Sequence, residues 1–385
     1  MAYDVAVVGL GGMGSAILAH SAARGASVIG LEQFHRGHDL GASSGRSRLI
    51  RKAYFESPAY VPLLQRAYEL WRELEKEASE KILRITGLLS VGDEHSEILK
   101  GTLHASQKYN LPLEQLSKRQ IMARYPALNL MEGEVGTFEA EAGVLTPERA
   151  IEAHLRMAEL QGAETRFNAK VESWNPLSDG FEIHLANGAH VSARKLVLTL
   201  GPWFKEILEG LGVPLRIQRN VQAWFSPSTP VYEAARFPCF FVQRREWPAP
   251  LYGFPDFGDG VKAAFHGHGA LTDAKHIDRE LSVSSDIEPL AQVLESWMPG
   301  AANSLREAKP CMYALTPDEH FVTDRHPEHA NLILCGGFSG HGFKFCSVVG
   351  EVGADLALDG GTRHEIGFLS LKRFKSGKMD LCDAE

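Results

Sequence analysis

The first thirty residues alternate between apolar runs and a turn rich in glycine. Residues 3–8 (YDVAVV) form a valine-rich apolar run, which is typical of a strand buried in a parallel sheet. Small residues from Gly14 to Arg24 predict a helix, and residues 27–31 predict a second strand that ends at Glu32. This order of elements predicts a βαβ unit at the start of the chain.

Two later stretches show the period of an amphipathic helix. Apolar residues recur at helical spacing between glutamates and lysines over residues 58–81, and residues 147–161 predict another helix. From 213 to 310 the aromatic and proline content rises and alternating strand patterns dominate. Further strands are expected near 170–172, around a hairpin turn at Asn187-Gly188, over 195–200, and at the start of 331–345, where a glycine turn and a helix follow.

This pattern predicts an α/β fold (α+β overall) in which a dinucleotide-binding Rossmann domain is assembled from distant parts of the chain. A mostly antiparallel domain is inserted between those parts. We assign residues 1–85, 146–212 and 311–370 to the cofactor domain, 86–145 and 213–310 to a substrate domain, and 371–385 to a loose C-terminal tail.

Composition narrows the class of protein. The 385 residues are 44% hydrophobic and 23% charged, which suits a globular chain of two domains. A net charge of −8 argues against a nucleic-acid or anionic-membrane partner. The apolar stretch from Val5 to Leu18 has no basic segment before it, so we expect neither a signal peptide nor a membrane span. Five scattered cysteines without a C-x-x-C pair favour a reducing compartment, and we expect a cytoplasmic protein.

The first glycine motif, Gly9-Leu10-Gly11-Gly12-Met13-Gly14, fits G-x-G-x-x-G between a strand and a helix. Gly9 allows the tight turn, Gly11 lets the backbone approach a pyrophosphate, and Gly14 permits close packing of helix on strand. Glu32 stands 18 residues after Gly14, at a strand end where its carboxylate can accept both ribose hydroxyls. The acid favours NAD or FAD over NADP, and a merely structural turn is the alternative.

A second glycine loop favours FAD over NAD. Residues 336–342 (GGFSGHG) follow an apolar strand and open a helix. Flavin reduction places negative charge on one edge of the ring, and the amides at a helix N-terminus stabilise such charge. An ordinary glycine-rich connection would have the same composition.

Three further segments are candidates for chemistry. Residues 45–52 (GRSRLIRK) hold four cations, which could surround an anionic cofactor and a carboxylate substrate or form a solvated basic face. His266-Gly267-His268 has no third ligand nearby, so we expect no metal. Cys311 alone would be a small buried hydrophobic residue.

Together these residues resemble the family of monomeric sarcosine oxidase and N-methyltryptophan oxidase, FAD-dependent amine oxidases of the D-amino acid oxidase superfamily. The similarity runs from Tyr3 to about Leu369. Its most specific parts are residues 47–54 (SRLIRKAY), 252–255 (YGFP), 311–313 (CMY) with 316–321 (TPDEHF), and 337–345 (GFSGHGFKF).

The resemblance implies a glutathione-reductase-like FAD domain and assigns roles to single residues. Cys311 would bind the flavin 8α-methyl through a thioether, and Arg51 and Lys344 would hold a substrate carboxylate. Arg48 and Lys262 would lie on the opposite flavin face, where the lysine activates oxygen. Three residues, His266, Tyr252 and Tyr313, would line the substrate pocket. The expected FAD contacts are Gly9, Gly11, Gly12, Met13, Gly14, Glu32, Ser43, Ser44, Arg48, Val171, Gly201, Cys311, Gly337, Gly340, His341, Gly342 and Lys344.

The implied reaction is oxidative demethylation of sarcosine or a related N-methyl amino acid, with amino acid, formaldehyde and hydrogen peroxide as products. The partners would be that small secondary amino acid and O2, and the enzyme would be a monomer. The chain departs from the family at Ser43-Ser44-Gly45-Arg46, where relatives carry His-His-Gly-Asp, and Lys262 follows Phe257 one residue sooner. A cyclic imino acid oxidase, a dehydrogenase that passes electrons to a carrier, and a non-catalytic flavoprotein are the alternatives.

Overall fold

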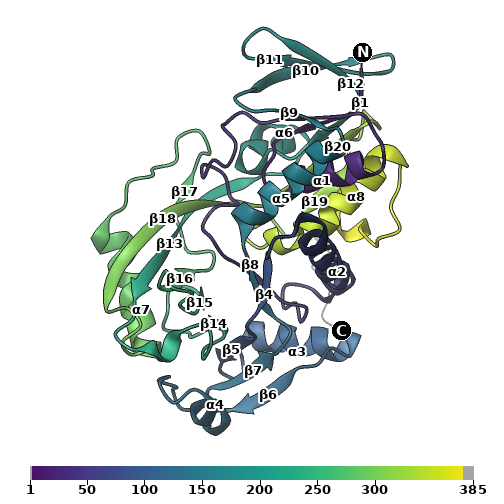
Figure 1. The fold of residues 1–385 in the computed structure, drawn as a ribbon. Helices are drawn as coiled ribbons and strands as arrows, with labels where there is room; N and C mark the ends of the chain where they lie inside the picture. Colours follow the sequence, from purple (N-terminus) through teal and green to yellow (C-terminus); the bar gives the residue numbers. More distant parts are fainter. Residues whose placement is uncertain (1, 376–385) are drawn as a thin grey trace.

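Strand β1 (Tyr3–Val8) lies in the middle of an eight-stranded sheet and pairs in parallel with β2 (Val28–Leu31) and β12 (His190–Leu198). The computed structural model describes residues 2–375 and places this sheet at the end of the molecule that carries the N-terminus (Figure 1). The remaining strands are β9 (Glu164–Arg166), β10 (Val171–Leu177), β11 (Gly180–Leu185), β19 (Val322–Arg325) and β20 (Leu332–Gly336). The order of the whole sheet is β10-β11-β12-β1-β2-β9, and in addition β20 pairs with β12 and β19 pairs with β20.

Small residues allow two helices to pack closely under this sheet. Helix α1 (Gly12–Ala23) lies against α8 (Cys346–Leu358) and α5 (Pro147–Leu160). A Cβ added at Gly350 would come within 2.7 Å of Ala16, and one at Gly353 within 2.6 Å of Ile17. The absent side chains therefore let α8 approach α1, which fixes the segment just before α8 next to the first glycine turn.

A second, mostly antiparallel sheet occupies the opposite end of the molecule (Figure 1). Its order is β17-β13-β16-β15-β14-β5-β7-β6, and β18 pairs with β13. The bounds are β5 (Leu88–Gly92), β6 (Glu114–Ser117), β7 (Val135–Glu139), β13 (Arg216–Ser226), β14 (Cys239–Val242), β15 (Leu251–Phe254), β16 (Val261–Phe265), β17 (Leu271–Thr272) and β18 (Ser304–Leu315). A small sheet of β3 (Arg48–Ile50), β8 (Gly143–Leu145) and β4 (Leu83–Ile85) lies between the two.

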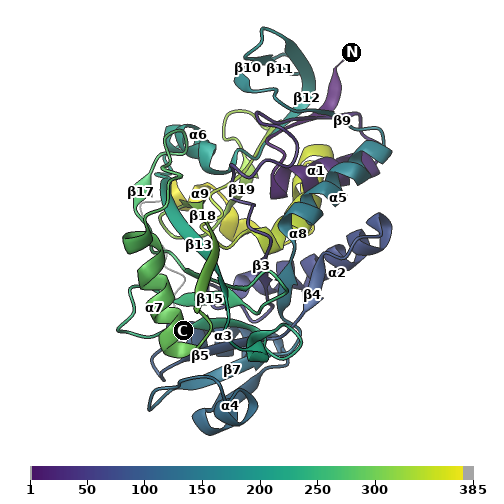
Figure 2. The same cartoon turned by 60° about the vertical axis from the view of Figure 1, so that its left-hand side comes forward.

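The remaining helices lie on both sheets and in the tail, and α6 buries Leu208 in the core of the first sheet. They are α3 (Glu97–Tyr109), α4 (Lys118–Arg124), α6 (Lys205–Gly210), α7 (Glu288–Trp297) and α9 (Lys372–Lys375). Helix α7 runs along the sheet near β13 and β18 (Figure 2) and buries Leu290, Leu294 and Trp297 in the core of that sheet. We did not expect this helix, because alternating strand patterns dominate residues 213–310.

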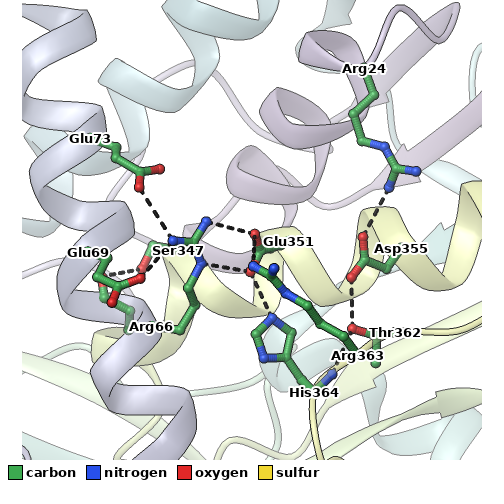
Figure 3. Close-up of polar contacts among 11 residues, drawn as sticks. Arg24, Arg66, Glu69, Glu73, Ser347, Glu351, Asp355, Thr362, Arg363 and His364 are labelled. Carbon is green, nitrogen blue, oxygen red and sulfur yellow. Dashed lines mark hydrogen bonds and ion pairs between the residues drawn. The ribbon is translucent and has the colours of Figure 1, made fainter.

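The long helix predicted over 58–81 is shorter in the structure. Ser57 caps a single 3-10 turn at Pro58–Tyr60, and α2 follows from Val61 to Ala78, where Ser79 adopts a left-handed conformation. An ion-pair network ties α2 to α8 (Figure 3): Arg66 donates to both carboxylate oxygens of Glu351 at 2.9 and 3.0 Å. The network therefore holds α2 and α8 in a fixed relation.

The C-terminal tail is packed at its beginning. We expected it to be loose from Leu371 onward, but Leu371 is buried and Arg373 pairs with Asp318. Residues 376–385, which include Cys382, lie outside the described residues. The four cysteines within residues 2–375 are free thiols, and no helix in that part of the chain is long and apolar enough to cross a membrane. The domain boundaries stay a prediction.

Candidate active site

One cavity of about 820 Å³ runs from the first glycine loop to the second sheet. Its lining includes Glu32, the loop at residues 9–13, Lys344 and aromatic side chains of the second sheet. Of the site residues expected from the sequence, the cavity is lined by Gly9, Gly11, Gly12, Met13, Glu32, Ser43, Ser44, Arg48, Arg51, Val171, Gly201, Tyr252, His266, Cys311, Tyr313, Gly337, Gly340, His341, Gly342 and Lys344. Gly14 and Lys262 were also expected at the site but do not line the cavity.

The turn between β1 and α1 leaves a helix N-terminus facing the cavity. Gly9 has a φ of +89°, and a Cβ there would lie 2.5 Å from the carbonyl oxygen of Thr199. A Cβ at Gly14 would lie 1.8 Å from the carbonyl oxygen of Gly9, so Gly14 serves packing rather than contact. Gly11 has no side chain of its own to cap the helix, the amide of Gly12 donates to the hydroxyl of Ser43 at 3.3 Å, and a Cβ at Gly11 would lie 3.7 Å from that hydroxyl. The first amides of α1 thus face the cavity beside a small hydroxyl group, an arrangement that suits an anion.

Glu32 is held at the end of β2 with its carboxylate toward the cavity. Its Oε2 accepts the amide of Leu10 at 2.8 Å and its Oε1 accepts the amide of Phe34 at 3.1 Å. Burial alone would raise the pKa of Glu32, but hydrogen bonds from His38 and from these two amides hold the pKa below its ordinary value. The carboxylate is thus ionised and keeps lone pairs free for two hydroxyl groups.

These features fit FAD. The cavity is lined by an ionised acid that suits a ribose, by a glycine-rich helix N-terminus that suits a diphosphate, and by a second glycine loop that suits a ring edge. In the second loop, Ser339 has a φ of +46° and Gly340 a φ of +78°. A Cβ at Gly340 would lie 2.3 Å from the Tyr313 ring, so only glycine leaves the loop this close to the aromatic wall.

Arg51 presents a buried guanidinium to the cavity. It is 3% exposed and lies 4.3 Å from the centres of both the Tyr54 and Phe55 rings. Its Nη2 donates to both oxygens of Glu56 at 2.7 Å, whereas its Nε is buried with no partner. Burial opposes the charge of Glu56, yet Arg51 lowers the pKa of that carboxyl to about 2. Nothing in the sequence pattern indicated this internal ion pair between Arg51 and Glu56.

Lys344 supplies the second cation and is fixed by its backbone and its neighbours. Its Nζ donates to the carbonyl of His341 at 2.7 Å and to the hydroxyl of Tyr54 at 3.3 Å. The indole of Trp71 donates to the carbonyl of Lys344 at 3.0 Å, so α2 positions this residue directly. Burial and the nearby charge of Arg51 lower the pKa of Lys344 to about 7.

His341 is neutral in this arrangement. Its Nε2 lies 3.0 Å from the carbonyl of Glu319 and its Nδ1 lies 2.6 Å from the hydroxyl of Tyr54. Nε2 therefore donates and Nδ1 accepts. Burial lowers the pKa of His341 to about 3, so the ring adds no charge to the site.

Aromatic residues of the second sheet close the far side. Phe241, Tyr252, His266 and Tyr313 surround the end of the cavity, and His266 lies 5.6 Å from the Phe241 ring and 5.7 Å from the Tyr313 ring. Burial lowers the pKa of His266 to about 4. His268, two residues on, is exposed and does not line the cavity. Phe241 was missed in the sequence because nothing local distinguishes it from a core residue.

Lys262 and Arg48 occupy a different part of the site. The Nζ of Lys262 donates to the carbonyls of Gly45 and Ser47 at 2.6 and 3.1 Å and lies near the rings of Trp224 and Phe254. Burial and the charge of Arg48 lower the pKa of Lys262 well below its ordinary value. Burial raises the pKa of the Cys311 thiol, while Arg48 and Lys262 act in the opposite direction.

The chain is similar to known proteins over almost its whole length. A family model described as FAD dependent oxidoreductase matches residues 4–356. The chain is 41% identical over 377 residues to monomeric sarcosine oxidase of Streptomyces avermitilis, which covers 96% of this chain and 97% of that one. It is 32% identical over 378 residues to N-methyl-L-tryptophan oxidase of Yersinia pestis, which covers 97% of this chain and all of that one (100%).

Solved structures share the fold at lower sequence identity. L-proline dehydrogenase from P. horikoshii superposes with a TM-score of 0.85 at 20% identity, over 98% of this chain and 99% of that one. The open form of NikD, an unusual amino acid oxidase essential for nikkomycin biosynthesis, gives a TM-score of 0.85 at 24% identity, over 96% and 97% of the two chains. These likenesses establish the fold alone.

Proposed function

The chain belongs to the family of FAD-dependent oxidoreductases, and we propose that it is an oxidase that demethylates sarcosine or a related N-methyl amino acid. The family resemblance, the α/β fold and the FAD cofactor predicted from the sequence are confirmed. The names of the relatives suggest the class of substrate, and the geometry of this chain's cavity supports the same class here.

One observation carries the proposal: two buried cations, Arg51 and Lys344, line the same end of the cavity beside a closed aromatic wall. Buried cations are costly unless an anion joins them, and a guanidinium binds a carboxylate with two hydrogen bonds. Glu56 satisfies Arg51 only in part, since one buried N–H lacks a partner. A small amino acid that presents its carboxylate to Arg51 and Lys344 would place its amine against the aromatic residues.

The side chains also favour the neutral amine. Arg51 and Lys344 are positive neighbours, and His266 stays uncharged because its pKa is about 4. Positive charge nearby disfavours a protonated amine. The methyl amine loses two electrons and two protons to become an imine, and water splits the imine into formaldehyde and the primary amino acid. When bound, FAD accepts the hydride equivalent and passes two electrons to O2, which takes two protons and leaves as hydrogen peroxide.

Two further roles belong to this proposal. Lys262 supplies a compact fixed cation for the charge that develops on oxygen, in surroundings closed to water. Cys311 lines the cavity and would carry the flavin as a thioether. A monomeric, cytoplasmic enzyme stays our expectation from the sequence.

Anaerobic mixing of the holoenzyme with a panel of amines tests the function. We expect sarcosine and small N-methyl amino acids to bleach the flavin absorbance, and an N-methyl amine without a carboxylate to do so far more slowly. Faster bleaching by proline or pipecolate would instead identify a cyclic imino acid oxidase. A flavin that no amine reduces would identify a protein without oxidase activity.

A further inference from the structure

We infer that Glu148 acts through the peptide between Gly45 and Arg46 to position Lys262 and to stabilise its ammonium charge for the oxygen step. This inference rests on the proposed oxidase function, because Lys262 has an oxygen-directed role only there. Glu148 lies in the first turn of α5, in the cofactor part of the molecule, whereas Lys262 lies on β16 of the second sheet.

The connection is a series of hydrogen bonds. Oε1 of Glu148 accepts the amide of Gly45 at 2.8 Å and the amide of Arg46 at 3.0 Å. The carbonyl of Gly45, which belongs to the same peptide unit as the Arg46 amide, accepts Nζ of Lys262 at 2.6 Å. A carboxylate, a peptide and an ammonium therefore stand in line. Hydrogen bonds in such a chain polarise one another, so the charge of Glu148 strengthens the carbonyl as an acceptor.

The backbone of this loop is shaped to hold an anion. Gly45 has a φ of +110° and Arg46 a φ of +62°, and Arg46 is one of few residues other than glycine with a positive φ in the described chain. Successive amides in such conformations converge on one point and form an anion-binding concavity. The carboxylate of Glu148 occupies that point. It thereby offsets the backbone strain of Arg46 and fixes the direction of the Gly45 carbonyl.

Lys262 depends on this carbonyl because no carboxylate bonds to it within residues 2–375. Its hydrogen-bond partners are the carbonyls of Gly45 and Ser47, and the rings of Trp224 and Phe254 lie 4.9 and 5.1 Å from Nζ.

Four charged or titratable groups act on Lys262 from the surrounding elements: Arg48, Cys311, Glu148 and Asp259. Burial and Arg48 oppose the ammonium, whereas Glu148 and Asp259 support it. Glu148 is the acid among them that is also joined to Lys262 through a peptide. Removing its charge should lower the pKa of Lys262, and removing its oxygens should also release the loop.

The experiment compares Glu148→Gln with a matched control, Glu307→Gln. Both changes replace a glutamate by its amide beside the same loop, but Glu307 pairs with the side chain of Arg46 instead of its backbone amide. Two measurements are made on each holoenzyme. Stopped-flow mixing gives the rates of anaerobic reduction by sarcosine and of reoxidation by O2 across pH, and carbon-13 NMR of labelled lysine follows Cε of Lys262, assigned by its loss in Lys262→Met.

We expect Glu148→Gln to lower the NMR titration midpoint of Lys262 by about one pH unit. Reoxidation should slow by up to about tenfold as pH rises above the wild-type midpoint, since a shift of one unit changes the protonated fraction by that factor, while reduction by sarcosine stays within threefold of wild type. Glu307→Gln should leave both half-reactions and the midpoint near wild-type values. If Glu148→Gln does not yield folded holoenzyme, Glu148→Asp, which withdraws the carboxylate, should show the same selective loss.

Three results would overturn the inference: an unchanged Lys262 midpoint in Glu148→Gln, an equal slowing of both half-reactions, or the same shift in Glu307→Gln. Failure of the proposed function is a different result. In that case wild-type flavin is not reduced by any amine, and the NMR midpoints still decide whether Glu148 controls the charge of Lys262.

Discussion

Replacing Lys344 by methionine tests the carboxylate site most sharply, because the structure fixes the position of this lysine and lowers its pKa to about 7. The side chain is 5% exposed, and its Nζ donates to the carbonyl of His341 and to the hydroxyl of Tyr54. Methionine keeps the length and the apolar contacts and removes the ammonium. The two acceptors left behind are both near Lys344, so the change is confined to this corner of the cavity.

The magnitude follows from one charge-assisted hydrogen bond to a ligand carboxylate. Such a bond contributes about 1.5–3 kcal/mol, which corresponds to a loss of about 10- to 150-fold in affinity. The sign of the pH dependence follows from a pKa of about 7 for Lys344 in the folded protein. The ammonium is present below this pH and is lost as pH rises through it. Binding of a carboxylate should therefore weaken above pH 7, by up to about tenfold per unit, until Arg51 alone remains.

The assay is titration of the holoenzyme with acetate, followed by the change in flavin absorbance, at a series of pH values. Wild type should bind acetate more weakly as pH rises above 7, and Lys344→Met should bind weakly with no inflection there. Lys52→Met is the matched control, since Lys52 pairs with Glu141 and does not line the cavity. The reasoning would be refuted if Lys344→Met bound acetate within twofold of wild type, or if the acetate affinity of both proteins showed the same inflection near pH 7.

Three other changes have defined outcomes. Cys311→Ala should release all flavin into the supernatant on acid denaturation, whereas wild type should keep a fluorescent band on a denaturing gel; free flavin from wild type would contradict a thioether. Lys262→Met should slow reoxidation by O2 by orders of magnitude and anaerobic reduction much less, and stopped-flow rates of reoxidation within about twofold of wild type would exclude Lys262 as the oxygen-activating group. Glu56→Gln leaves Arg51 without its buried carboxylate partner, so the melting temperature should fall. Acetate should bind to this variant more tightly than to wild type and should raise the melting temperature again. Weaker acetate binding would show that Glu56 supports the ligand instead of competing with it.

The sequence was most informative where the chemistry is local. The glycines of the first turn and Glu32 lie within one βαβ unit, so their spacing alone predicts their arrangement. Lys344 and Arg51 line the same cavity because α8 packs on α1 and the small sheet positions the segment after β3. Residue spacing could not predict that the two lie together, and only the family resemblance suggested it.

Other features depend on the packed structure and could not be read from spacing. Glu56 pairs with Arg51 inside the cavity, and Glu148 bonds to the amide of Gly45, which lies 103 residues earlier in the chain. Helix α7 was missed although its buried residues 290, 294 and 297 follow helical spacing, because strand-like aromatic segments surround it. Strand β18 begins at Ser304 and runs through residue 310, where we had placed a domain boundary, so that one strand joins the second sheet to Cys311.

The most direct test of the proposed oxidase is the stoichiometry of products from sarcosine. Holoenzyme is mixed with a limiting amount of sarcosine in air-saturated buffer, and formaldehyde, glycine, hydrogen peroxide and oxygen uptake are measured. We predict one equivalent of each product and one of oxygen consumed for every sarcosine. Consumption of sarcosine without peroxide would contradict an oxidase, and the absence of formaldehyde with every N-methyl amino acid would contradict demethylation.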